Sequence, residues 1–514
     1  MGARRLFIRG SGIAGWYYIG PVSCLKRTRH PLDPQSGGAP SPVIVARADH
    51  PVSRAQISGN ALKVLYRLKD AGYQAFLVGG CVRDLLIGIE PKDFDVATDA
   101  SPEDVRRLFR NCRLIGRRFR LAHVRFGPQV IEVATFRAAG APMAIDPDLD
   151  GVTDEDAESD VPLDEHGDIN GNVAGPEDDD DGDRAHDERG RLLRDNVYGS
   201  IDQDVWRRDF TCNALYYSIQ DFSIWDYVGG VDDVRARTIR LIGDPETRYR
   251  EDPVRMLRAV RFEAKLGFTI HDSARAPFAK LAELLEHIPP ARLLDEFQKL
   301  FLAGFGQRSF DLLRAHGLLD HLFPATAAHL AAEPAGMALA LIRAGLADTD
   351  RRVAEGRAVT PMFLFAVMLF GPVSAAAQKR FEAGVPPAVA IADAVDEVVA
   401  AQNRRIGIPK RFSIPMRELL ALQPRFHRRE GRRSLSFLSH PRFRAAYDFL
   451  VLRAGAGAED PEIARWWTEL QTLTPEQQRD RVGSDGGAQE PGTGGRRRRR
   501  RRGGRRHAPP PDES

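Results

Sequence analysis

The spacing of apolar residues predicts a mixed α/β region in the first half of the chain. Residues 55–70 carry apolar side chains at helical spacing and are followed by Gly72, which suits the left-handed end of a helix. Short apolar runs bounded by glycine or polar residues are typical of strands. The expected strands are residues 75–78, 94–97, 121–126 and 130–136, with short helices at 82–87 and 101–109. Ser101 followed by Asp104 resembles a capping box at the start of the second helix. We therefore expect a compact α/β head.

From about residue 257 the apolar spacing becomes helical and stays so to about residue 455. Pro289-Pro290 opens a helix whose apolar positions include Leu293, Phe297 and Leu300. The longest purely apolar run, residues 361–370, is about half of the roughly 20 residues that a membrane-spanning helix requires. We interpret it as a buried core helix and expect no transmembrane segment.

The charges of the 514-residue chain are strongly segregated, although its 74 basic and 71 acidic residues nearly balance. Residues 146–188 hold 19 acidic side chains and one basic one, and residues 496–506 hold nine arginines. Neither stretch is expected to fold alone. We interpret the acidic stretch as an inserted surface loop. Electrostatic competition for the basic tail and an inert solvated insertion are the two alternatives for its role.

Two features of the sequence give information on the cellular location of the protein: the four cysteines and the basic first 32 residues. Cys24, Cys81, Cys112 and Cys212 form no CxxC pair or zinc-ligand spacing, which fits a reducing cytoplasm. Residues 1–32 contain six basic and no acidic side chains, which is compatible with a targeting peptide or with a disordered leader. We predict a cytoplasmic protein.

Asp93 and Asp95 are the strongest candidates for chemistry. They lie two apart on an expected strand, so both side chains leave the same face. Adjacent carboxylates repel unless cations neutralise them, and Mg²⁺ prefers oxygen ligands supplemented by substrate phosphates. The pair predicts a two-metal phosphoryl-transfer site. In isolation, an Asp-x-Asp more often marks an exposed strand end or turn.

Gly79-Gly80 precede this pair, between an expected strand and a short helix, where backbone N–H groups can approach phosphate oxygens. The alternative is an ordinary tight turn. Arg83 is a candidate for binding the triphosphate or the sugar. An ion pair with a neighbouring acid is the alternative for Arg83.

Five segments together resemble one family. They are residues 76–84 (FLVGGCVRD), 93–95 (DFD), 207–214 (RRDFTCNA), 226–233 (DYVGGVDD) and 251–262 (EDPVRMLRAVRF). Over roughly residues 55–455 the chain resembles the class II CCA-adding enzyme and poly(A) polymerase family of nucleotidyltransferases. The resemblance implies an α+β fold with a polymerase-beta-like α/β head, an all-α neck, body and leg, and a disordered basic tail.

The domain boundaries expected on this basis cover the whole chain. They are a disordered leader at 1–50, a head at 51–235 with a disordered acidic insertion at 146–190, a nucleotide- and RNA-binding helical neck at 236–300, a helical body and RNA-binding region at 301–455, and a disordered Arg-rich tail at 456–514.

The resemblance also implies roles for individual residues. Asp93 and Asp95 become metal-binding catalytic carboxylates, and Asp209 a third acid of the active site. Glu132 is another candidate for the extra carboxylate, because it leaves its expected strand opposite Ile131. A structural pair of Glu132 with Arg137 is equally compatible with the sequence.

Asp252 and Arg255 lie three apart on an expected helix, where an acceptor and a forked donor could recognise the edge of a base. An ion pair between the two is the alternative. Arg207 and Arg208 either contact phosphates or occupy a helix start without further function.

The reaction implied by the resemblance is transfer of adenylate from ATP to RNA 3′ ends, with two Mg²⁺ ions and release of pyrophosphate. Residues 114–127 resemble the poly(A) polymerase form of this strand pair more than the CCA-adding form. The Arg-rich tail, including Arg496, Arg497, Arg498, Arg499 and Arg500, favours generic RNA binding. A CCA-adding enzyme and a noncatalytic RNA-binding protein are the alternatives. Partners in RNA decay are implied by the resemblance only, and we expect a monomer.

Overall fold

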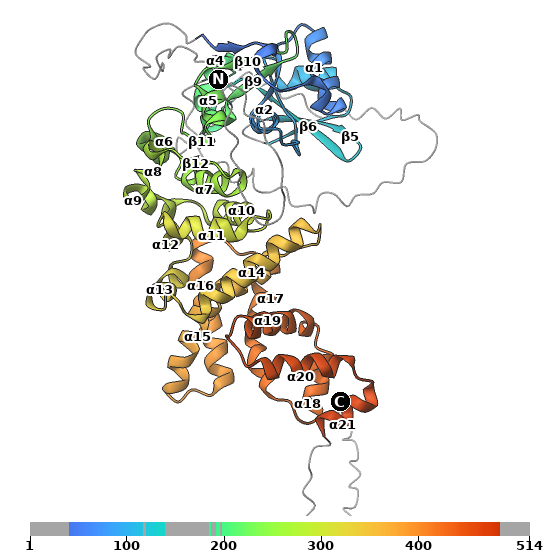
Figure 1. Ribbon diagram of the computed structural model, residues 1–514, viewed down its shortest axis with the longest axis vertical. Helices are drawn as coiled ribbons and strands as arrows, with labels where there is room; N and C mark the ends of the chain where they lie inside the picture. Colours follow the sequence, from blue (N-terminus) through green and yellow to red (C-terminus); the bar gives the residue numbers. More distant parts are fainter. Residues whose placement is uncertain (1–40, 117–119, 139–183, 187–191, 196–197, 484–514) are drawn as a thin grey trace, which may run out of the picture. The chain divides into compact units, whose positions relative to one another are not determined.

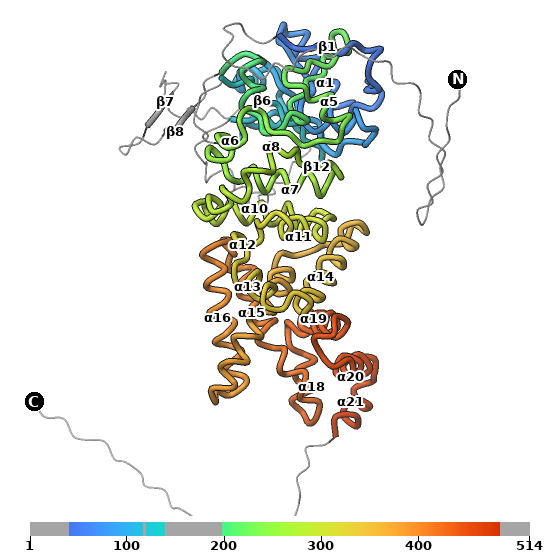
Figure 2. The backbone as a smooth tube through the Cα atoms, turned by 60° about the vertical axis from the view of Figure 1, so that its left-hand side comes forward, coloured from blue at the N-terminus to red at the C-terminus, as the bar shows by residue number. Residues whose placement is uncertain are grey.

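The computed structural model describes residues 41–116, 120–138, 184–186, 192–195 and 198–483. Parts of three predicted segments therefore lie outside the described residues. They are residues 1–40 of the leader, most of the acidic insertion, and the tail from residue 484 onward. Two compact units are present: residues up to 255 with 266–277 form the first, and residues 256–265 with those from 278 onward form the second. Figure 1 and Figure 2 follow the chain through both units.

An eight-stranded mixed sheet forms the centre of the first unit, in the order β1-β10-β9-β2-β3-β6-β5-β4 (Figure 1). Its strands are β1 (Val43–Val45), β2 (Ala75–Val78), β3 (Asp95–Thr98), β4 (Cys112–Ile115), β5 (Leu121–Phe126), β6 (Gln129–Thr135), β9 (Leu215–Ser218) and β10 (Ile224–Asp226). The strands expected at 75–78 and 121–126 are confirmed, and those expected at 94–97 and 130–136 are displaced by one residue. Within this sheet only β3 and β6 pair in parallel.

Short helices connect and cover these strands. They are α1 (Gly59–Asp70), α2 (Gly80–Leu86), α3 (Pro102–Leu108), α4 (Ile201–Arg207), α5 (Gly230–Arg235), α6 (Pro245–Glu251) and α8 (Asp272–Arg275). The capping box predicted at the start of α3 is confirmed: the Ser101 hydroxyl accepts from the Asp104 N–H at 3.1 Å, and the Asp104 carboxylate accepts from the Ser101 N–H at 3.2 Å.

The core on one face of the sheet follows from strand alternation. Phe76 and Val78 leave the same face of β2 and pack with Phe136, Val205 and Tyr216. Val205 comes from α4, so this helix covers that face of the sheet.

Three predictions for the first unit are wrong: where the head begins, that the neck is all-α, and that the insertion is disordered to residue 190. β1 pairs with β10, with Ile44 opposite Trp225, so the head begins before residue 51. A two-stranded parallel sheet of β11 (Thr238–Ile239) and β12 (Thr269–Ile270) lies in the neck that was expected to be all-α. β7 (Arg184–His186) pairs with β8 (Leu192–Asp195), so the insertion expected to be disordered to residue 190 contains a strand.

The second unit is helical, as predicted. It contains most of α7 (Val254–Leu266), followed by α9 (Phe278–Leu281), α10 (Pro290–Phe301), α11 (Gly306–Ala315), α12 (Leu319–Leu322), α13 (Pro324–Ala332), α14 (Met337–Ala354), α15 (Pro361–Glu382), α16 (Pro387–Arg405), α17 (Lys410–Ala421), α18 (Arg432–Leu438), α19 (Phe443–Gly455), α20 (Pro461–Thr472) and α21 (Pro475–Val482) (Figure 2). α10 begins at the second proline of Pro289-Pro290, as expected, and buries its apolar stripe.

Helix α15 is longer than its apolar run indicated. Among the described residues it is the one helix whose length and composition would suffice to cross a membrane, but 56% of its apolar window is buried inside the protein. It packs against α13, α14, α16 and α17. We therefore interpret it as the core helix of this unit, in line with the sequence prediction.

The tail predicted from residue 456 starts too early. Helices α20 and α21 lie beyond that boundary, and Trp467 is fully buried in an aromatic cluster with Phe426, Phe437 and Phe443. Its indole N–H donates to the carbonyl of Phe426 at 2.8 Å. The folded chain therefore continues at least to Val482.

Candidate active site

The carboxylates of Asp95 and Glu132 come from neighbouring strands. Asp95 is the first residue of β3 and lies opposite Val78 of β2. Val96 pairs with Val133 of the parallel strand β6, so the preceding residues Asp95 and Glu132 lie side by side on one face. Asp93 precedes β3, so the prediction that both aspartates lie on the strand is wrong. The pairing of β3 with β2 stops at Asp95, because β2 ends at the opposite residue, Val78, just before the glycine turn.

An open pocket of about 280 Å³ lies at this point of the sheet. Its lining residues are Val78, Asp95, Val96, Leu121, Glu132, Ala134, Arg137, Arg207 and Arg208. We call Asp93, Asp95 and Glu132 the acid cluster, and Arg207 and Arg208 the arginine pair. Acidic and basic side chains therefore line one pocket.

The acid cluster carries unfavourable charge. Solvent reaches the Asp95 side chain, but the surrounding protein displaces much of its hydration, and this raises its pKa. The charges of Glu132 and Asp93 raise the pKa of Asp95 further, to about 6, against the opposing effect of Arg208. Burial and the charge of Asp93 likewise raise the pKa of Glu132, against Arg137. A bound cation would relieve this repulsion.

Glu132 also lies near His123 of β5, with 3.8 Å between Nε2 and Oε2. Burial lowers the pKa of His123, so this histidine gives little positive charge at neutral pH. Arg137, the partner considered from the sequence, lines the same pocket. Glu132 therefore contributes negative charge beside Asp95.

Asp204 of α4 binds both residues of the arginine pair, and it is only 1% exposed. Arg207 Nε donates to its Oδ1 at 2.7 Å, and Arg208 Nη2 donates to its Oδ2 at 2.9 Å. The Tyr216 hydroxyl donates to the same Oδ2 at 2.6 Å. Burial alone would raise the pKa of Asp204, but Arg208, Arg207 and Tyr216 together lower it to about 2. Sequence reasoning missed Asp204 and Tyr216, although Asp204 stands at i−3 and i−4 from two arginines, a spacing that indicates ion pairs on a helix.

The glycine turn precedes α2. Gly79 has φ 78° and ψ −132°, a conformation that side chains rarely adopt. Its N–H donates to the Leu215 carbonyl at 3.1 Å. Arg83 is only 2% exposed, and its guanidinium binds Asp84 at 2.7 Å and also donates to Asn213. These contacts favour the ion-pair interpretation of Arg83.

Asp209 lies on the segment that joins α4 to β9, and its Oδ1 accepts from the Phe210 N–H at 2.8 Å and from Asn213 Nδ2 at 3.4 Å. Its charge acts on Cys212 and on Arg248. The acids that act most strongly on Asp95 are Glu132 and Asp93. Glu132 therefore belongs to the acid cluster, and a role of Asp209 as a further active-site acid stays a prediction.

Asp252 and Arg255 do not share a helix face as predicted. α7 begins at Val254, and Asp252 precedes Pro253 with an extended backbone at φ −150° and ψ 94°. A residue before proline avoids the helical conformation, which explains the difference. Both side chains are buried. Arg255 Nη1 donates to Glu251 at 3.0 Å and to the Arg248 carbonyl at 2.6 Å.

Arg248 of α6 joins this segment to the arginine pair. Its Nη2 donates to the carbonyls of Arg207 and Arg208, at 3.1 and 2.6 Å. The sequence did not single out this residue. Backbone positions around the pocket are thus fixed from the neck segment.

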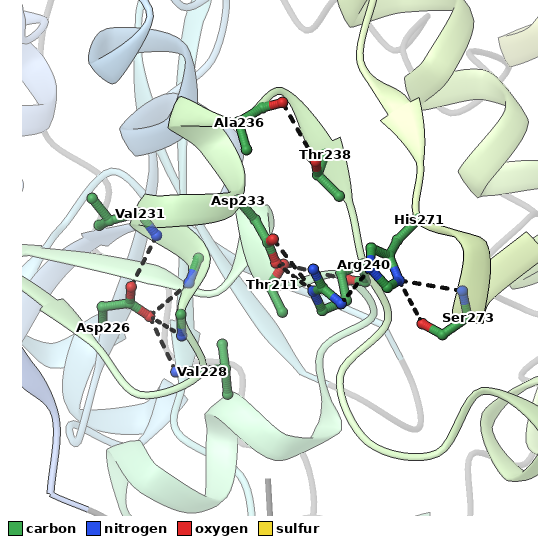
Figure 3. A network of polar contacts seen from close by, with 12 residues as sticks. Thr211, Asp226, Val228, Val231, Asp233, Ala236, Thr238, Arg240, His271 and Ser273 are labelled. Atoms are coloured by element: carbon green, nitrogen blue, oxygen red, sulfur yellow. Dashed lines mark hydrogen bonds and ion pairs between the residues drawn. The ribbon is translucent and has the colours of Figure 1, made fainter. Parts of the chain in front are cut away.

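The segment at residues 226–233 is a scaffold. The Asp226 carboxylate accepts from the N–H groups of Val228, Gly229, Gly230 and Val231, as Figure 3 shows. Asp233 binds the Thr211 hydroxyl at 2.7 Å and Arg240 Nε at 3.1 Å. Figure 3 continues this network through Arg240 Nη1 to His271, at 2.9 Å. It ties α5 to the small sheet of β11 and β12.

Comparison with known proteins covers nearly the whole chain. The models for a poly A polymerase head domain, a probable RNA and SrmB-binding site of polymerase A, and a polymerase A arginine-rich C-terminus match residues 75–240, 267–330 and 383–506. Poly(A) polymerase I of Escherichia coli O6:H1 is 47% identical over 87% of this chain and 89% of its own length. The chain belongs to the poly(A) polymerase family. It is therefore a nucleotidyltransferase. Its substrates are a nucleotide and RNA, and it uses a divalent metal ion.

Other relatives define the alternatives within this fold. Poly(A) polymerase I of Haemophilus influenzae is 42% identical over 85% of this chain and 90% of its own length. The CCA-adding enzyme of Bacillus velezensis is 33% identical over only 51% of this chain and 55% of its own length. A solved tRNA-processing enzyme in an apo form aligns with 82% of this chain and 99% of its own, at a TM-score of 0.50 and 19% identity, which shows a shared fold.

Proposed function

We propose that this poly(A) polymerase family member extends RNA 3′ ends with adenylate from ATP, without a template, through two Mg²⁺ ions at Asp93 and Asp95. The observation that carries the proposal is that Asp95 and Glu132 line one pocket with the arginine pair, while the charge of Asp93 acts on both of these acids. The similarity to poly(A) polymerases over almost the full length, against about half for the CCA-adding enzyme, favours adenylation.

The donor set of the acid cluster fits Mg²⁺. Among the described residues no group of three or more His, Cys, Asp or Glu is arranged to enclose a metal. Mg²⁺ commonly takes only one or two carboxylates and completes its shell with water and substrate phosphates, so Asp93 and Asp95 suffice as protein ligands. Glu132 adds negative charge beside them and supports the site.

The transfer joins the RNA 3′ oxygen to the α-phosphorus of ATP and breaks the bond from that phosphorus to the bridging oxygen, whose electron pair leaves with pyrophosphate. The hydroxyl proton passes to water. Bound divalent ions would lower the pKa of the 3′-hydroxyl and neutralise charge on the leaving group. The chain positions the reactants, with the backbone of Gly79 and Gly80 near the phosphates and Arg83 fixing that turn through Asn213.

Base selection by Asp252 and Arg255 remains part of the proposal. It rests on the hydrogen-bonding capacity of a carboxylate and a guanidinium for a base edge and on the family resemblance, since both side chains are buried in this structure. Asp209 as a further active-site acid also stays a prediction, as do the cytoplasmic location, the monomeric state and partners in RNA decay. The arginines at 496–500 are proposed to hold RNA through its phosphates in a salt-sensitive manner.

The test is extension of a short, labelled oligoribonucleotide that is not a tRNA, with each nucleoside triphosphate offered separately. Asp93→Asn and Asp95→Asn remove charge without changing shape, and Asp70→Asn is the matched control, since Asp70 is an exposed acid on α1 outside the pocket. We expect long ladders with ATP alone for the wild type and Asp70→Asn, and none for the pocket variants.

Two other outcomes would replace the proposal. Extension confined to tRNA, stopping after a few residues and requiring CTP with ATP, would identify a CCA-adding enzyme. RNA binding without any extension would identify a noncatalytic RNA-binding protein.

A further inference from the structure

The segment of residues 209–213 reaches two parts of the site. Asp209, the predicted further acid, lies at its start. At its end, the Asn213 side chain accepts from Arg83, and the Asn213 carbonyl oxygen lies 3.6 Å from the point where a Cβ on Gly79 would stand. A displacement of this segment would therefore move Asp209 and would also disturb the support of the glycine turn.

The start of the segment is paired with the chain that follows β11. The Ile242 N–H donates to the Asp209 carbonyl at 3.0 Å, and the Thr211 N–H donates to the Arg240 carbonyl at 2.9 Å. Two backbone hydrogen bonds are a short pairing, and the element that supplies them has to be held in place itself. The position of the segment therefore depends on how Arg240 is held.

Helix α5 contacts both Thr211 and Arg240. The Thr211 hydroxyl donates to Asp233 Oδ2 at 2.7 Å, and Arg240 Nε donates to the same oxygen at 3.1 Å. A Cβ on Gly230 would lie 2.2 Å from the Thr211 carbonyl oxygen, so the backbone of α5 is in direct contact with the segment. Thr211 and Asp233 are buried. One carboxylate thus links the side chain of Thr211 to the arginine that holds its backbone.

His271, the residue before α8, binds the other end of the Arg240 guanidinium, as Figure 3 shows. Its Nε2 lies 2.9 Å from Arg240 Nη1. A guanidinium only donates, so Nε2 is the acceptor and we assign the ring hydrogen to Nδ1, which donates to the Ser273 hydroxyl at 2.8 Å. The His271 N–H donates to the Ile239 carbonyl of β11 at 2.9 Å, which fixes the backbone of the histidine.

We propose that Asp233, Arg240 and His271 are positioning residues that hold the 209–213 segment in place for nucleotidyl transfer. They do not line the pocket described above, and they act through the backbone and the hydroxyl of the segment. The inference rests on the proposed function for the roles of Asp209 and of the glycine turn. Loss of the link should lower turnover and leave RNA binding unchanged.

Two substitutions of His271 separate this role from the capping of α8. Glutamine reaches about as far as Nε2 and offers Arg240 an acceptor, but it is a poor residue before a helix. Asparagine reaches only about as far as Nδ1 and caps helices well, but it leaves Arg240 Nη1 without this acceptor. Arg275→Gln, which removes an exposed guanidinium from α8, is the matched control.

Turnover, the KM for RNA and amide hydrogen exchange of peptides that cover residues 209–213 are measured on the full chain. For His271→Asn we expect kcat to fall about fivefold and exchange of the segment to rise about fivefold, with the KM for RNA within about twofold of wild type. His271→Gln and Arg275→Gln should stay within about twofold of wild type in all three measurements.

A double variant tests whether Arg240 and His271 act through one contact. Arg240→Gln loses both the ion pair with Asp233 and the contact with His271, so its kcat should fall further, by roughly twentyfold. Adding His271→Asn should then cause little further loss. If Arg240→Gln does not fold, the comparison of the two His271 variants still decides the question.

Three results would overturn the inference: equal behaviour of His271→Asn and His271→Gln, faster exchange of the segment with unchanged turnover, and additive losses in the double variant. A larger loss in His271→Gln would do so as well, since capping of α8 would then be what matters. Hydrogen exchange needs no catalysis, and turnover can be followed with whichever nucleotide the wild type transfers. Failure of the proposed function and failure of this inference are therefore distinguishable.

Discussion

Replacing Asp95 by asparagine should stabilise the metal-free protein while abolishing its activity. The pKa of Asp95 rises from 3.8 to about 6 because surrounding protein, Glu132 and Asp93 all disfavour its negative charge. Two pKa units correspond to about 3 kcal/mol. Solvent reaches this side chain and screens its charge, so we expect about 1 kcal/mol of stability to be recovered by the neutral amide.

The sign of the effect depends on pH. Since the folded-state pKa of Asp95 lies above its unfolded value, the charged carboxylate destabilises the fold fully above about pH 6 and not at all below 3.8. The advantage of Asp95→Asn should therefore be largest at neutral pH and should shrink towards pH 5. Mg²⁺ should raise the melting temperature of the wild type at pH 7.5 but not that of the variant.

Thermal unfolding with a chelator present tests this reasoning. About 1 kcal/mol corresponds to roughly 2–4 °C for a unit of this size. Asp70→Asn controls for the loss of an acid as such and should change the melting temperature by less. A lower or equal melting temperature for Asp95→Asn at pH 7.5, or a gain equally large at pH 5, would refute the account of charge repulsion.

Three further substitutions test the scaffold. Gly79→Ala should cost about 1–2 kcal/mol in urea unfolding because of its positive φ, whereas Gly59→Ala, which meets open space on α1, should be neutral or better. Asp226→Asn should cost about 1–3 kcal/mol, since the amide NH₂ cannot accept from the Val231 N–H; a stability equal to wild type in the same titration would contradict this. Trp467→Ala should lower the free energy of unfolding of the second unit by about 3–5 kcal/mol and should remove much of its near-ultraviolet circular dichroism signal. An unchanged spectrum would show that the aromatic cluster does not depend on the indole.

Local patterns predicted several elements of both units well. The strand at 75–78, the capping box at Ser101 and the helix after Pro289 all depend on residues close in sequence, so periodicity and capping chemistry were sufficient. The proximity of Asp93 and Asp95 is likewise local. A family resemblance carried by five motifs identified the reaction class.

The rest of the site depends on pairings that sequence spacing does not show. Glu132 meets Asp95 only because β3 and β6 pair in parallel in one register. Asp204 meets Tyr216 across the space between α4 and β9. One missed boundary did have a local signal: the residue before Pro253 disfavours a helix, and this was reason to start α7 after Asp252.

Strand β1 has a practical consequence for anyone who produces shortened versions of this protein. Cutting at residue 51, the boundary expected from the sequence, would remove strand β1 and leave the backbone N–H and C=O groups on that edge of β10 unpaired. An uncovered strand edge recruits further strands from other molecules. Expression vectors that begin after Val45 should therefore give aggregated material, and those that retain Val43–Val45 should not.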